Sequence, residues 1–121
     1  MISGRVGIRG DRGQATVAAI GVIAALLTVT VGALDVARAV ALSHQARAAA
    51  DFAALAAAGA AARGEAAAGA CAEAARVARA NGAAVRSCEV APGAVVTVTT
   101  TRTSDVPWPR TAVGVARAGP G

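Results

Sequence analysis

The sequence predicts an α+β protein: a long N-terminal helix that starts in a membrane and continues as a stalk, a second short helix, and a small antiparallel sheet of about three strands. Three observations predict it. No charged side chain lies between Arg12 and Asp35, the segment from there to Ala62 is alanine-rich and free of proline, and Val and Thr become frequent after Gly82. Helix formers followed by β-branched residues are typical of this class.

The 121 residues divide into four expected regions. They are a basic cytoplasmic leader (1–13), a transmembrane helix (14–35), a helical stalk that continues the span (36–62), and a small extracytoplasmic α+β region (63–121).

The segment 14–35 has the length and composition of a membrane span. At about 1.5 Å per residue, a helix of this length matches the roughly 30 Å hydrocarbon core of a bilayer. A helix also satisfies every backbone amide internally, as lipid requires. The alternative is a buried helix of a soluble protein, but the rest of the chain is too rich in alanine to build a core around it.

Four small residues of the span fall at three- and four-residue spacing along one side: Gly21, Ala25, Thr28 and Gly32. Because lipid provides no hydrophobic drive between helices, close approach through small residues is how spans associate. We expect this side to be a helix-packing surface.

The leader carries Arg5, Arg9 and Arg12 against a single Asp11. Basic residues beside the first span favour a cytoplasmic N-terminus, which leaves residues 63–121 outside the cytoplasm. A cleaved signal peptide is the alternative, since Ala37-Arg38-Ala39 has the small-x-small pattern of a cleavage site. The apolar run is longer than the usual signal core of 7–15 residues.

The stalk carries opposite charges at helical spacing. Asp35 and Arg38 lie three residues apart, and Arg47 and Asp51 lie four apart, so each pair is expected to support the helix by a few tenths of a kcal/mol. Asp35 and Arg38 sit at the membrane boundary, where they pair within the helix or with charges of a partner.

Beyond Gly64, a second helix is expected over residues 65–80, ended by Asn81-Gly82. Three strands follow, over residues 83–90, 94–103 and 111–118. Pro92-Gly93 forms the turn of a hairpin, and Pro107-Trp108-Pro109 forms a loop before the last strand. In the middle strand, Val96, Val98 and Thr100 share one face.

The two cysteines, Cys71 and Cys88, both follow the span, in the second helix and the first strand. On the extracytoplasmic side a disulfide is chemically permitted, and it would tie helix to sheet. Two unpaired buried thiols are the alternative.

Composition and charge argue against several functions. The formal net charge of +5 comes entirely from scattered arginines, and one Phe and one Trp give almost no aromatic interleaving, so we expect no nucleic-acid binding. The acidic residues Glu65, Glu73, Glu89 and Asp105 look like solvated charges, and no nucleophile–base arrangement is present. His44 and two cysteines are too few for a zinc site. We expect no enzyme activity, cofactor, metal or small-molecule substrate.

The order of short motifs carries a family resemblance. Gly13-Gln14-Ala15-Thr16-Val17 precedes the apolar span, Asp35-Val36-Ala37-Arg38 follows it, and the segment from Ala48 to Ala58 reads AAADFAALAAA. This order resembles the TadE/TadG-like proteins of the tight-adherence (Flp-type) pilus assembly system, and the whole chain is similar to the short actinobacterial TadE-like proteins. The positions that match the motif are Gly13, Asp35, Arg38, Asp51 and Leu55.

The resemblance implies a bitopic, pseudopilin-like envelope protein of a pilus or a type II/IV secretion-like machine. Its partners would be membrane lipid and other pilus or secretion proteins, including TadE-like homologues. Pilin-like members have Glu at the fifth position after the processed glycine, whereas Ala18 stands there if Gly13 precedes the cut. Peptidase processing and charge-guided assembly are therefore not predicted. A small protein secreted after signal-peptide cleavage remains the alternative function.

Overall fold

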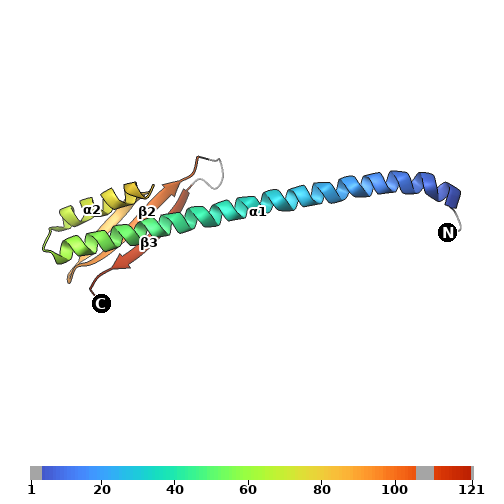
Figure 1. Ribbon diagram of the computed structural model, residues 1–121. Helices are drawn as coiled ribbons and strands as arrows, with labels where there is room; N and C mark the ends of the chain where they lie inside the picture. Colours follow the sequence, from blue (N-terminus) through green and yellow to red (C-terminus); the bar gives the residue numbers. More distant parts are fainter. Residues whose placement is uncertain (1–3, 106–110, 121) are drawn as a thin grey trace. The chain divides into compact units, whose positions relative to one another are not determined.

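The computed structural model describes residues 4–105 and 111–120, and the side chains of its first helix from residue 13 onward. In that part of the chain two helices precede three strands (Figure 1). Their bounds are α1 Gly4–Ala62, α2 Ala67–Ala80, β1 Ala84–Ala91, β2 Val95–Thr103 and β3 Thr111–Ala118. The predicted α+β fold, with a long helix, a short helix and a three-stranded antiparallel sheet, is confirmed.

The main difference from the expected elements lies at the start of α1. The helix begins at Gly4 rather than Gln14, so most of the expected leader is helical. Once a helix is nucleated, each added residue costs little because it also adds a hydrogen bond, which allows the extension despite several glycines. The expected loop Pro107-Trp108-Pro109 lies outside the described residues.

The chain forms two compact units, Met1–Val36 and Ala37–Gly121, called here the N-terminal and C-terminal units. The expected stalk, residues 36–62, therefore belongs almost wholly to the C-terminal unit. Instead of standing alone, this part of α1 forms the core with α2 and the sheet.

The sheet has the order β1-β2-β3, and both pairings are antiparallel. Residues 92–94 connect β1 and β2, where the expected Pro92-Gly93 turn is present. The β1–β2 register shifts between Val85 and Ser87, whereas the β2–β3 register runs without a break from Thr111 to Ala118. Both helices cover one face of this sheet, on which Val96, Val98 and Thr100 are fully buried.

The core consists almost entirely of alanine. The buried cluster takes alanines from both helices, and its largest members are Val96 and Val98 of β2. Alanine buries little area, so each contact contributes little at about 25 cal/mol per Å². Small side chains instead let the helices and the sheet approach closely.

The closest approach is between α1 and the strands at Ala46. Thr100 Oγ1 of β2 donates a buried hydrogen bond of 2.6 Å to the Ala46 carbonyl oxygen. On β3, a Cβ at Gly114 would lie well inside contact distance of that carbonyl and of the Arg47 amide nitrogen. Only glycine fits at position 114 without moving the helix, and its burial follows from this contact.

The helix α2 ends in a hydrogen-bonded cap that also involves β2. Gly82 has φ +74°, and the amides of Gly82 and Ala83 donate to the carbonyls of Arg79 and Ala78, which is the Schellman arrangement. Arg102 Nη1 donates to the Asn81 carbonyl at 2.9 Å, so a cation sits at the negative end of the helix. The expected stop at Asn81-Gly82 is present and is stabilised from the sheet.

A disulfide joins Cys71 of α2 to Cys88 of β1, as expected, with their Cα atoms 5.8 Å apart. Cys88 packs against the core cluster. The bond closes a loop with a sequence separation of 17 residues, which in the chain-entropy model stabilises the fold by about 3 kcal/mol. It compensates for the small area that an alanine core buries.

We predict that replacing both cysteines, Cys71→Ser with Cys88→Ser, lowers the free energy of unfolding of the C-terminal unit by about 3 kcal/mol. Pulse proteolysis of the full chain in urea measures this, with Ser87→Ala as a nearby exposed control. A double variant as resistant as the native chain would contradict the role of the bond.

We also predict that Gly114→Ala destabilises the C-terminal unit by about 1–3 kcal/mol, because the added methyl group must push α1 away from the sheet. The matched control is Gly59→Ala in α1, where the nearest atom is Arg63 Nη1 at 3.5 Å. The control should be neutral or slightly stabilising because alanine favours the helix. Thermal unfolding of the two variants distinguishes the effects.

Candidate functional site: exposed faces of α1

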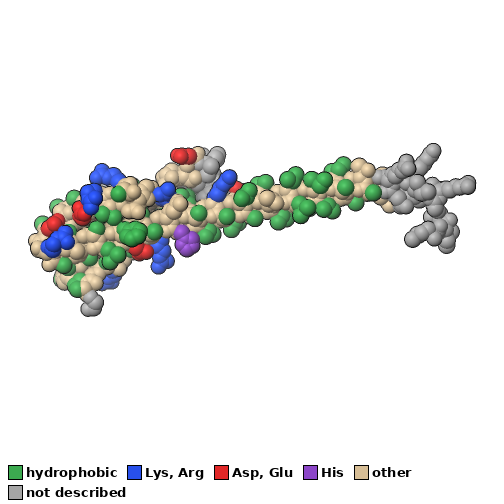
Figure 2. Space-filling view, viewed as in Figure 1, with side chains coloured by type: hydrophobic (Ala, Val, Ile, Leu, Met, Phe, Trp, Pro, Cys, Tyr) green, Lys and Arg blue, Asp and Glu red, His purple; other side chains and the backbone are tan. Residues whose placement is uncertain are grey.

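The N-terminal unit presents apolar side chains all around α1. From residue 13 to 34 every side chain of the helix is exposed, including Val17 at 70% and Leu27 at 62%. On the face seen in Figure 2, hydrophobic side chains run along this part of α1, and no charged ones lie between its described start and the charged side chains of the C-terminal unit. A helix that is apolar on all faces needs an apolar environment.

Two hydroxyl groups of this segment, those of Thr28 and Thr30, are satisfied inside the helix. Thr28 Oγ1 donates to the Ala24 carbonyl at 2.8 Å, and Thr30 Oγ1 donates to the Leu26 carbonyl at 2.8 Å. Lipid offers no partner to a polar group, so internal bonds of this kind are what a span requires.

The four residues expected to pack against another helix are all exposed: Gly21, Ala25, Thr28 and Gly32. A Cβ placed at Gly21 or Gly32 would meet no atom within 4 Å. The described residues therefore leave this side of the helix open, with room for a neighbouring backbone to approach.

The long apolar helix near the N-terminus is compatible with a single-pass membrane anchor and equally with a signal sequence. The boundary between the two compact units lies between Val36 and Ala37. The small-x-small pattern at Ala37-Arg38-Ala39 coincides with that boundary, and the first fully packed residue of the C-terminal unit is Leu42.

On the C-terminal unit, two residues of the family-like motif, Asp51 and Leu55, lie on the solvent side of α1. Leu55 is 61% exposed, and Phe52 beside it is 54% exposed. The expected ion pair between Arg47 and Asp51 does not form; this prediction is wrong. Both side chains are exposed, and water solvates each of them as well as the partner would.

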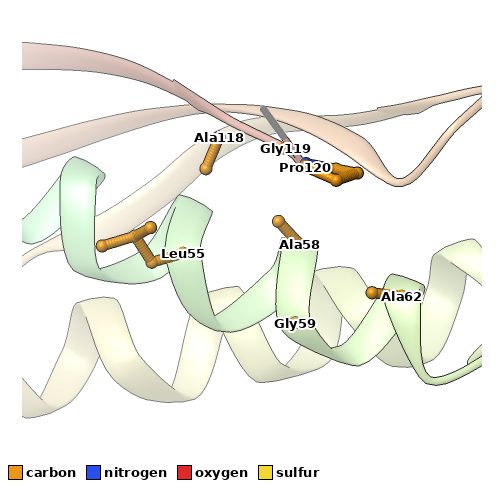
Figure 3. A pocket seen from close by; sticks show the side chains of 7 residues that line it. All are labelled: Leu55, Ala58, Gly59, Ala62, Ala118, Gly119 and Pro120. Carbon is orange, nitrogen blue, oxygen red and sulfur yellow. The ribbon is translucent and has the colours of Figure 1, made fainter.

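Leu55 lines an apolar groove between α1 and the end of β3 (Figure 3). Its other walls are Ala58, Gly59 and Ala62 of α1 and the segment Ala118-Gly119-Pro120, and its volume is about 250 Å³. This groove was not predicted from the sequence. Its signal was the placement of Leu55, Gly59 and Ala62 on one helix face, opposite the alanines that enter the core.

Local, solvent-exposed ion pairs join some of the described charges. Arg76 Nε donates to Glu73 Oε2 at 3.1 Å, and this hydrogen bond holds the pKa of the Glu73 carboxyl below its usual value. Arg63 lies 3.7 Å from Glu65. Among the residues that the structure describes, no three His, Cys, Asp or Glu side chains gather closely enough to hold a metal ion.

No family model, no curated protein and no solved structure matches this chain. The family resemblance therefore depends on the motif residues alone, of which Asp51 and Leu55 lie on the exposed face of α1.

Proposed function

We propose that the chain is a single-pass membrane protein that works as a pseudopilin-like subunit of a Flp/Tad-type pilus or a type II/IV secretion-like assembly. It acts by helix packing and binding to partner proteins. Its N-terminus is cytoplasmic and its C-terminal unit is extracytoplasmic. The observation that carries the proposal is the apolar surface of α1 over residues 13–34, on which every side chain is exposed.

Three further features support this function. The hydroxyl groups of Thr28 and Thr30 both donate to carbonyls of the same helix, so they need no partner from lipid. The open side at Gly21 and Gly32 suits lateral contact with another span. The disulfide between Cys71 and Cys88 is stable in an oxidising compartment, which favours an extracytoplasmic C-terminal unit.

A second function, that of a small protein secreted after signal-peptide cleavage, is supported by one observation. The small-x-small pattern at residues 37–39 lies at the boundary between the two compact units. Cleavage there would remove the apolar segment and leave the packed residues from Leu42 onward together. The mass of the mature chain in the membrane and culture fractions distinguishes the two functions.

Labelling of engineered cysteines tests the topology. In intact cells, a membrane-impermeant maleimide should modify Ser104→Cys and spare Ser3→Cys, because only the C-terminal unit lies outside. Permeabilised cells, in which both positions should react, are the control. Modification of Ser3→Cys from outside would reverse the proposed orientation.

Substitution on the open side of the span tests the packing mechanism. Gly32→Leu keeps the segment hydrophobic, so insertion should survive, but the added volume should hold a neighbouring helix away and lower copurification of partners several-fold. Val29→Leu, which enlarges a side chain that is already bulky and 69% exposed, is the matched control. Equal recovery of the same partners with both variants would leave the span as a plain anchor.

A further inference from the structure

The outer edge of β3 is unprotected. β3 pairs with β2 on one side, and the described residues place no strand on its other side. Natural edge strands are usually blunted by bulges, prolines or charges, because an open edge accepts another strand. The opposite edge, β1, has a bulge at Arg86 and a contact with α2. β3 has an unbroken register, no proline and a single charge, Arg117.

The sequence of β3 is complementary to itself. Residues Ala112 to Ala116 read AVGVA, which is the same in both directions about Gly114. If a second β3 pairs antiparallel with a two-fold axis at Gly114, Val113 lies opposite Val115 of the second copy, and the alanines lie opposite each other. Val113 is 48% exposed and Val115 is 56% exposed, so each would gain a β-branched cross-strand neighbour.

The helices leave room for this pairing. The Ala46 carbonyl contacts both Thr100 of β2 and Gly114 of β3, so α1 crosses the sheet above the gap between these strands. Neighbouring strands lie about 4.8 Å apart, so α1 is half of this spacing from β3 on one side, and the two-fold axis is half of it from β3 on the other side. The axis of α1 therefore lies roughly 5 Å from the two-fold axis. The two copies of α1 would then be about 10 Å apart, the distance at which helices pack.

The charged residues of α1 beside the β3 edge are also complementary between the two copies. Leu55 lines the groove at the end of β3, so Asp51 and Arg47, one and two turns earlier, lie on the same side of α1. Neither side chain has an ion-pair partner among the described residues. The two-fold axis makes the helices antiparallel, which offers Asp51 of each copy to Arg47 of the other.

We propose that the free edge of β3 is a self-association site, where a second copy of this chain adds its own β3 antiparallel and extends the sheet. The two-fold axis makes the α1 segments of the two C-terminal units antiparallel. The site goes beyond the proposed assembly function, because it joins copies through the C-terminal unit rather than through the span.

Mixed cross-linking of the full chain in detergent tests the register. Val113→Cys and Val115→Cys copies, mixed and mildly oxidised, should form a disulfide-linked dimer, whereas either variant alone should give several-fold less. The control mixture pairs Val113→Cys with Glu89→Cys on the opposite edge and should stay monomeric. Equal dimer formation in all mixtures, or none in the first, would overturn the proposal.

A charge swap tests the helix contact separately. Arg47→Asp and Asp51→Arg should each weaken dimerisation roughly ten-fold, since each change replaces two attractive pairs with repulsive ones. The double swap should restore the native dissociation constant, which a merely structural effect would not do. A double variant as weak as the single variants would refute the contact.

These measurements are made in the Gly32→Leu background, which weakens association through the span. Loss of partner copurification by Gly32→Leu reports on the proposed function, and loss of the mixed cross-link reports on β3. The two results therefore distinguish a failure of the proposed assembly function from a failure of the β3 self-association site.

Discussion

The fold of the C-terminal unit depends on how closely α1 approaches the sheet at Ala46. One carbonyl of the helix accepts the buried hydroxyl of Thr100 and lies against the backbone of Gly114. A larger side chain at Ala46 of α1 or at Gly114 of β3 would separate the helix from the sheet and break this hydrogen bond. The alanines on this face of α1 therefore have two effects: their small side chains let the sheet approach closely, and they favour the helix.

That requirement limits how much the core can stabilise the unit. Alanines, with Val96 and Val98, fill the buried cluster, and few large side chains contribute area. Cross-links supply what the core lacks: the disulfide ties α2 to β1, and Arg102 ties β2 to the end of α2. Both connect the second helix to the sheet, where α2 would otherwise be held mainly by the methyl groups of Ala70, Ala74 and Ala78.

Sequence alone predicted the elements of the fold well, because their signals are local. Gly64 and Asn81-Gly82 mark the helix ends, Val and Thr mark the strands, and each strand begins or ends within one residue of its expected bounds. What required the structure was long-range packing. Alanine on all faces of residues 36–62 gives no hydrophobic periodicity, so the face that enters the core, from Leu42 to Ala60, was not predictable. The pairing of Arg47 with Asp51 failed because helical spacing permits an exposed ion pair without making it favourable.

In most proteins the large apolar side chains fill the core, whereas in the C-terminal unit several of them lie on the surface. Its core is built of alanine, while Phe52, Leu55, Val113 and Val115 are about half exposed or more. Single exposed apolar residues are common in proteins and require no explanation. Here, however, the large residues lie on the outer side of α1 and on β3, where they do not compete with the close approach at Ala46. Close packing inside thus leaves the bulky apolar side chains available for contacts outside, so the constraint that shapes the core also shapes the surface on which a partner would bind.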